Sequence, residues 1–141
     1  MLETAALIGA AGDVLHWHAP AGRTVVSLPD SRALWETMWE LRDQLVGVAH
    51  THPGVGAPAP SGTDLTTFDA CELGLGVRLR WWIATGDQLR CFVWRGPYSL
   101  DYERVPLLVE QPPWLDELRA RSGFTPDGPG VAKSITENLT P

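Results

Sequence analysis

A short apolar run in the middle of the chain places the strongest constraint on the fold. Residues 46–49 read VGVA, a near-continuous apolar run that is typical of a strand buried in a sheet. His50 and His52 stand at its end. Residues 54–60 then consist almost entirely of glycine, alanine and proline, a composition too rich in breakers for regular structure. We therefore expect a buried strand that ends at two histidines and opens into a loop.

Helical patterns precede and follow this strand. Residues 31–45, SRALWETMWELRDQL, place apolar side chains at helical spacing after a Pro-Asp-Ser start. Residues 61–76 are predicted to form a second helix that ends at Gly74 or Gly76. Ser61 is its expected N-cap and Asp64 lies in its first turn, as in a variant of the capping box. The carboxylate of Asp64 is thereby fixed at a helix start.

Alternating patterns elsewhere predict further strands. Residues 4–28 read as two or three short strands separated by Ala-Gly-Asp and Pro-Ala-Gly turns. Residues 77–84 and 88–96 read as two strands joined by a hairpin turn at Thr85-Gly86-Asp87. In the first of these two strands, alternation predicts one face made of Val77, Leu79, Trp81 and Ile83 and another made of Arg78, Arg80 and Trp82.

The length of 141 residues suits one domain, with enough apolar content to bury a core without disulfides or a structural metal. We assign the folded domain to residues 1–110. Residues 111–141 hold a short helix, WLDELRARSG, and a tail rich in proline and glycine that we expect to be mobile.

Charge and cysteine content exclude several classes of protein. The formal net charge of −6 argues against nucleic-acid binding, which draws its affinity from many Lys and Arg contacts to phosphate. Cys71 and Cys91 are too few and too isolated for a disulfide framework or a CxxC metal site, so we expect both to be reduced. No apolar stretch reaches the roughly 18 residues of a membrane span, and the chain starts without a basic leader. These features predict a soluble, cytoplasmic protein that binds another protein or a small molecule.

The two histidines and one carboxylate can converge on a single point. Residues two apart in a strand face the same way, so His50 and His52 can do so, and Asp64 can reach them across the loop. Two imidazole nitrogens and a carboxylate oxygen form a catalytic zinc shell whose fourth position holds water. Zinc lowers the pKa of that water toward about 7 and polarises a carbonyl, while a nearby Glu or Asp can transfer the proton to a leaving amine.

At these residues the chain resembles a known family. HTHP, seven loop residues and SGTD resemble the signature of the JAMM (MPN+, prokaryotic JAB-like) zinc metalloproteases, His-x-His-Pro followed at short range by Ser-x-x-Asp. ETAALIGA, residues 3–10, is similar to the strand of that family that begins with a glutamate, and RWWIATGDQLRCFVWRG to its later strand pair. The resemblance covers about residues 3–96 and implies an α/β fold with a curved mixed β-sheet flanked by helices.

The resemblance also implies an activity. Members are zinc-dependent isopeptidases or peptidases that cleave after the C-terminus of ubiquitin or a ubiquitin-like protein, and small bacterial relatives act on ubiquitin-like or sulfur-carrier proteins. Carried over by position, His50, His52 and Asp64 would bind Zn²⁺, Glu3 would be the general base and acid, and Ser61 would stabilise the oxyanion. Which modifier or conjugate is cleaved does not follow from the sequence.

Two other functions remain open. The chain could be a non-catalytic MPN-type scaffold that binds a ubiquitin-like partner, although such scaffolds normally lose one or more ligands. It could also be a zinc hydrolase of a small amide, which a closed, narrow pocket would favour.

Several residues also have an alternative interpretation. Ser61 is by default a plain N-cap. Glu36 and Glu40 are expected to be solvated, and either is the fallback base. His16 and His18 are expected to be an ordinary pair of strand residues, because no Ser-x-x-Asp follows them within a short loop. The face made of Trp82, Arg78 and Arg80 either grips the tail of a partner or packs beneath the C-terminal segment.

Overall fold

A six-stranded sheet and the helix that follows its third strand carry the metal-binding candidates. The computed structural model describes residues 1–25, 27–28 and 31–124, so the predicted tail lies outside the described residues. In chain order the elements are β1 (Ala5–Gly9), β2 (Val14–His18), α1 (Ser31–Glu40), β3 (Leu45–Thr51), α2 (Gly62–Leu75), β4 (Arg80–Ala84), β5 (Leu89–Trp94), β6 (Tyr102–Val105) and α3 (Leu115–Ser122).

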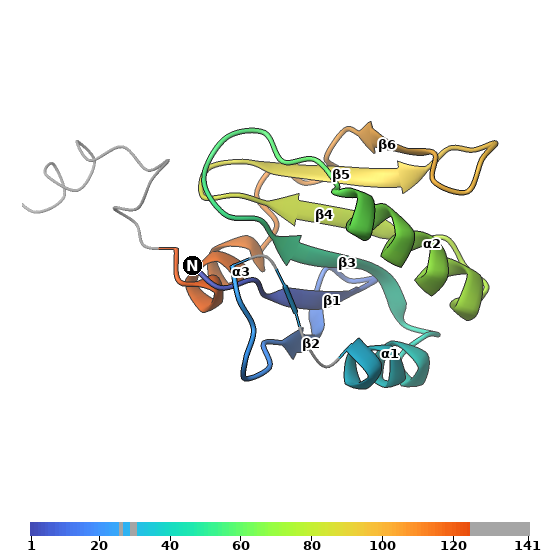
Figure 1. Cartoon of the computed structure of the whole chain (residues 1–141), viewed down its shortest axis with the longest axis horizontal. Helices are drawn as coiled ribbons and strands as arrows, with labels where there is room; N and C mark the ends of the chain where they lie inside the picture. The colour runs from blue at the N-terminus through green and yellow to red at the C-terminus, as the bar shows by residue number, and fades with distance from the viewer. Residues whose placement is uncertain (26, 29–30, 125–141) are drawn as a thin grey trace, which may run out of the picture.

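The sheet is mixed, in the order β2-β1-β3-β4-β5-β6. Only β3 and β4 run parallel, and the connection between them is α2, while every other neighbouring pair is antiparallel. A parallel pair requires such a crossover, and a helix usually provides it. The predicted α/β fold with a mixed sheet flanked by helices is confirmed (Figure 1).

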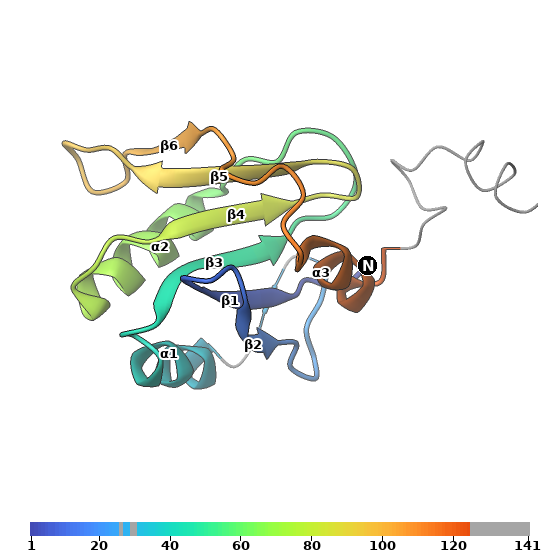
Figure 2. The same cartoon turned by 180° about the vertical axis from the view of Figure 1, so that it is seen from behind.

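Helices cover both faces of this sheet. The helices α1 and α2 lie on the face toward the viewer in Figure 1, and α3 lies on the face toward the viewer in Figure 2. One core cluster, which includes Phe68 and Trp81, fills the space under α1 and α2. A second cluster, which includes Trp114 and Leu118, fills the space under α3. Because side chains alternate along a strand, β3 supplies residues to both clusters and is buried on both sides.

The first helix is shorter than predicted. It ends at Glu40, residues 41–44 form a turn, and Leu45 already belongs to β3. The Arg42 guanidinium donates to the Trp39 carbonyl at 2.7 Å, and the Gln44 N–H donates to the Leu41 carbonyl at 2.8 Å. Leu41 and Leu45 continue the helical spacing because the turn packs against the same core as the helix. Apolar spacing alone could not locate this helix end.

Candidate metal centre

His50, His52 and Asp64 form a tight triangle of ligand atoms. The Nε2 atoms of the two imidazoles lie 3.1 Å apart. Asp64 Oδ2 lies 3.0 Å from His52 Nε2, and Asp64 Oδ1 lies 3.4 Å from His50 Nε2. His50 comes from β3, His52 follows that strand directly, and Asp64 lies in the first turn of α2. The structure therefore brings together the three residues that the sequence predicts as metal ligands.

These distances fit a single bound cation. A tetrahedral zinc ion with ligand bonds of about 2.0–2.1 Å keeps its ligand atoms about 3.3–3.4 Å apart. Here the two imidazoles face different oxygens of Asp64, at 3.4 and 3.0 Å, and one potential ligand atom from each of the three residues lies within 4.8 Å of the others. The contact of 3.1 Å between the two Nε2 atoms requires at least one of them to lack a proton, which is the form in which an imidazole nitrogen binds a metal. Among the described residues, this is the group that could hold a metal ion.

The start of α2 orients the carboxylate. The Ser61 hydroxyl accepts a hydrogen bond from the Asp64 N–H at 3.0 Å, and Asp64 Oδ2 accepts one from the Ser61 N–H at 2.9 Å, which completes a capping box. Burial alone would raise the pKa of Asp64, but its contacts with His50, His52 and Ser61 outweigh burial and hold this pKa well below its usual range. Asp64 is therefore ionised and ready to bind a cation.

The loop after His52 is attached to the β4–β5 turn. The His52 N–H donates to the Ala84 carbonyl at 2.9 Å. Further along, Gly56 donates its N–H to Asp87 Oδ1 at 2.8 Å and accepts from the Thr85 hydroxyl at 2.7 Å. Gly56 has a φ of 94°, which a glycine adopts without strain. Sequence reasoning treated this segment only as a loop rich in helix and strand breakers and missed the hydrogen bonds of Gly56 to Thr85 and Asp87. The Gly54-x-Gly56 pattern was the one signal of a special backbone conformation at this place.

Glu3 lies at the same centre. It precedes β1 and lines one cavity together with His50, Ser61 and Asp64. Its backbone N–H donates to the Thr24 carbonyl at 2.8 Å, and the Arg23 guanidinium donates to the Glu3 carbonyl at 3.3 Å. Burial raises the pKa of the Glu3 carboxyl, an effect that the nearby histidines oppose and the Asp64 charge supports. A carboxyl with a raised pKa beside a metal site is suited to carry a proton.

The cavity at the metal centre has a volume of about 510 Å³. Its polar side is formed by Glu3, His50, Ser61 and Asp64, and its remaining wall is mostly apolar. The apolar wall comes from β1, α1, β3, α2 and β4, through Ala5, Leu34, Met38, Val48, Phe68, Cys71 and Trp81. The cavity thus joins an ionic end to an apolar end.

The structure separates Arg78 from Arg80 and Trp82, the other two residues of the predicted substrate-binding face. Because β4 begins only at Arg80, the strand alternation does not extend to Arg78. Arg78 instead forms an ion pair of 2.8 Å with the buried Glu72 of α2 and stacks on Trp94, so grouping it with Trp82 was wrong. Sequence reasoning also missed Glu72, which no local motif marks.

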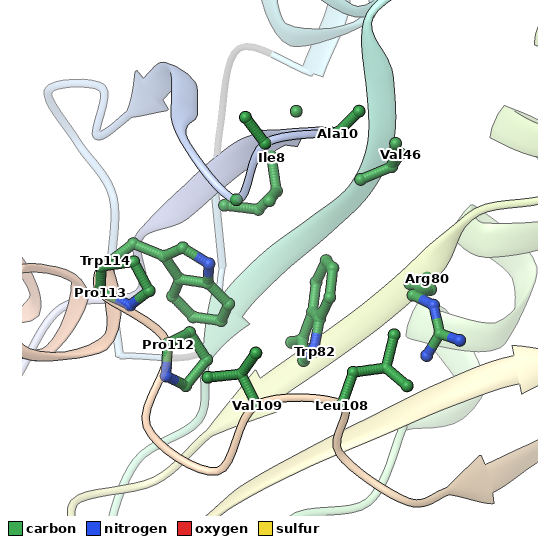
Figure 3. Close-up of a pocket in the computed structure, with 13 residues that line it drawn as sticks. Ile8, Ala10, Val46, Arg80, Trp82, Leu108, Val109, Pro112, Pro113 and Trp114 are labelled. Carbon is green, nitrogen blue, oxygen red and sulfur yellow. The ribbon is translucent and has the colours of Figure 1, made fainter.

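Trp82 and Arg80 do share a face, but it is the face opposite the metal centre. Trp82 packs edge-to-face on Trp114, with ring centroids 5.5 Å apart. Arg80, Trp82 and Trp114 line a separate cavity of about 430 Å³ between the sheet and the segment that precedes α3 (Figure 3). Packing beneath the C-terminal segment, the alternative interpretation of Trp82, therefore describes the structure.

The fallback residues lie away from the centre. Glu36 is exposed and pairs with Arg32 at 3.3 Å on the outer face of α1, and Glu40 is exposed as well. Neither residue lines the cavity at the metal centre. His16 and His18, with ring centroids 6.4 Å apart on β2, belong to no group of potential metal ligands in the described part of the chain.

Comparison with known proteins agrees with this geometry. In the described ranges, no helix is both long and apolar enough to cross a membrane. A search of curated proteins finds no match to the chain. Residues 2–95, well over half of the 141 residues, match the family described as prokaryotic homologs of the JAB domain. The matched region contains Glu3, Ser61 and the three potential ligands. The chain therefore belongs to the family of prokaryotic JAB-domain homologs.

Proposed function

We propose that this protein is a zinc-dependent isopeptidase or peptidase. The observation that carries the proposal is the triangle of His50, His52 and Asp64, whose potential ligand atoms lie within 4.8 Å of one another. Glu3 lines the same cavity as His50 and Asp64. JAB-domain proteins include metalloisopeptidases, which supports the same chemistry. The non-catalytic scaffold is less consistent with a complete ligand set.

Each polar residue of the cavity then has a chemical task. Zinc, when bound by the three ligands, supplies Lewis acidity toward a carbonyl and an acidified water. Glu3 would act as the general base and acid: its carboxyl would accept a proton from the attacking water and give it to the leaving amine, a role that its raised pKa favours. Ser61 accepts from the Asp64 N–H, and its own proton finds no acceptor in the described part of the chain, so it can donate to an oxyanion.

The proposed substrate is the C-terminal tail of a bacterial ubiquitin-like or sulfur-carrier protein, joined to a peptide or to a lysine. This assignment rests on the family resemblance, because such tails are what related isopeptidases cleave. It would make the partner a protein rather than a nucleic acid or a membrane, in agreement with the net charge of −6. The reduced cysteines and this class of partner suit a cytoplasmic protein.

The shape of the cavity favours a second candidate, hydrolysis of a small amide. The space beside the metal ligands is about 510 Å³ and mostly apolar, within the size range of small-molecule sites. An amide with a compact apolar group could place that group against Met38, Val48 and Phe68 with its carbonyl at the ligands.

Two substrate sets separate these functions. The zinc-loaded protein is incubated with ubiquitin-like fusions that end in glycine and, separately, with N-acyl amides of small apolar amines, and products are identified by intact mass. We expect cleavage after the glycine of the fusions, lost in His52→Ala. Cleavage of the small amides alone would favour the second candidate. Binding of the fusions without any cleavage would favour the scaffold and contradict the proposal.

A further inference from the structure

Three buried hydroxyl groups lie behind the metal centre. Thr4, Thr51 and Ser122 have exposed fractions of 0%, 0% and 1%. The Thr4 N–H donates to Thr51 Oγ1 at 3.0 Å, and the Thr51 N–H donates back to the Thr4 carbonyl at 3.2 Å. The hydroxyls of Thr51 and Ser122 hydrogen-bond each other at 3.0 Å, and Ser122 also donates to the Leu118 carbonyl at 2.8 Å. We call Thr4, Thr51 and Ser122 the hydroxyl cluster.

The hydroxyl cluster is joined to the reacting groups through the backbone. Thr51 stands between His50 and His52 in the chain, and Thr4 follows Glu3 directly. Side chains alternate along extended backbone, so the Thr51 side chain reaches Ser122 of α3 while His50 and Glu3 line the cavity. The paired backbones therefore set the position of the Glu3 carboxyl relative to the two imidazoles.

A second set of contacts holds the same segments to α3. The Leu2 N–H donates to the Ser122 carbonyl at 2.6 Å. Arg23 donates to the carbonyl of Glu3 at 3.3 Å and to that of Arg121 at 3.1 Å, and it also contacts the Thr4 hydroxyl. These hydrogen bonds therefore hold the segment around Glu3, the proposed base, against the C-terminal end of α3.

We propose that Ser122 is a positioning residue of the hydrolase, and that α3 completes the active centre although it lies beyond the matched residues 2–95. Ser122 acts through Thr51 and Thr4, which fix Glu3 against the histidine ligands. The inference rests on the proposed function, since it assigns Ser122 a role in the step that Glu3 performs.

The expected effect is on rate rather than on binding. Ser122→Ala removes one of the two hydrogen-bond partners of the buried Thr51 hydroxyl and leaves only the Thr4 N–H, so the threonine backbones can then shift relative to each other. A misplacement of about 1 Å at a reacting group can cost about 10²-fold in rate, and a smaller shift should cost of the order of tenfold. Zinc content should not change, because the three ligands remain.

The test is a double-mutant cycle in the full chain loaded with zinc. The steady-state kcat and KM for cleavage of a ubiquitin-like fusion are measured for the wild type, Ser122→Ala, Glu3→Gln and the double variant. We expect Ser122→Ala to lower kcat about tenfold with KM unchanged, and to have no further effect once Glu3 is replaced. Leu115→Val is the control, because it removes packing from α3 without touching the hydroxyl cluster.

A second readout does not need activity. Co²⁺ replaces zinc, and its d–d absorption reports the geometry of His50 and His52. We expect Ser122→Ala to shift this spectrum and Leu115→Val to leave it unchanged.

The outcomes separate this inference from the proposed function. If Ser122→Ala lowered kcat by the same factor in the wild type and in Glu3→Gln, the inference would be overturned. Equal spectra for the wild type and Ser122→Ala would overturn it as well. Neither result would contradict the proposed hydrolase function. A wild type that binds Co²⁺ but cleaves nothing would overturn the function, and the spectrum would then decide whether α3 shapes the metal site. A wild type that binds no Co²⁺ would overturn both.

Discussion

The carboxylate of Asp64 belongs both to a helix start and to the metal site. Its Oδ2 accepts the Ser61 N–H and faces His52, while Oδ1 faces His50. A carboxylate at a helix N-terminus is favoured by the helix dipole and by the free N–H groups there. The contacts that stabilise α2 therefore orient Asp64, while the two histidines, with a smaller contribution from Ser61, lower its pKa and keep it ionised, so metal binding needs little rearrangement.

Replacement of Glu3 should slow cleavage strongly and leave zinc binding unchanged. Glu3→Gln keeps the size of the side chain but removes the base, so we expect the cleavage rate to fall by about 10²–10⁴-fold with zinc content unchanged. Glu36→Gln is the matched control, because Glu36 pairs with Arg32 away from the cavity. Single-turnover cleavage is the measurement. A Glu3→Gln protein as fast as the wild type would show that another group is the base.

Both cysteines should resist alkylation while the protein is folded. Burial, together with the charge of Glu72, raises the pKa of Cys71 to about 11, and burial also raises the pKa of Cys91. The reactive thiolate is therefore scarce near neutral pH. Mass spectrometry after iodoacetamide treatment at pH 7.5 should find neither residue modified until denaturant is added. Rapid labelling of the half-buried Cys71 in the folded protein would contradict the raised pKa of its thiol.

Local patterns predicted the elements that carry the ligands. Helix α2 begins after the capping box at Ser61 and ends at the C-cap Gly76, as the sequence indicated. Both ends could be predicted because their signals lie within a few residues of the helix ends. The strand β6 was not predicted, since YERV is short and becomes a strand only by pairing with β5. The anchoring of Glu3 was also beyond sequence reasoning, because it depends on Arg23 and Ser122, which are far away in the chain.

Glu72 should be the residue that most strongly joins α2 to the sheet. Its buried carboxylate accepts hydrogen bonds from the Leu79 N–H, the Trp81 indole, the Tyr102 hydroxyl and the Arg78 guanidinium, at 3.0, 2.7, 2.6 and 2.8 Å.

Replacement by glutamine turns one acceptor oxygen into a donor that faces other donors. Glu72→Gln should therefore lower the free energy of unfolding by about 3 kcal/mol, as judged by urea denaturation. Exposed Glu103→Gln is the matched control and should change it by less than about 0.5 kcal/mol. A loss below about 1 kcal/mol in Glu72→Gln would mean that this network contributes little.

For the whole molecule, the metal should add stability to a fold that forms without it. Two core clusters on opposite faces of the sheet hold the domain together, and neither depends on a metal ion. Zinc binds the folded ligand triangle and not the unfolded chain, so zinc at about 1,000 times its Kd should stabilise the protein by about 4 kcal/mol. Chelator-treated protein should keep its far-UV circular dichroism and melt at a lower temperature. Complete unfolding on removal of the metal would show that the site is structural.

The central claim is that His50, His52 and Asp64 hold one catalytic zinc ion, and elemental analysis of the purified, zinc-loaded protein tests it most directly. The account predicts close to one zinc per chain in the wild type and in Glu3→Gln, because both retain the three ligands. It predicts a loss of most of that zinc when His50→Ala and His52→Ala are combined. Zinc far below one per chain in the wild type, or zinc retained by the double variant, would contradict the account.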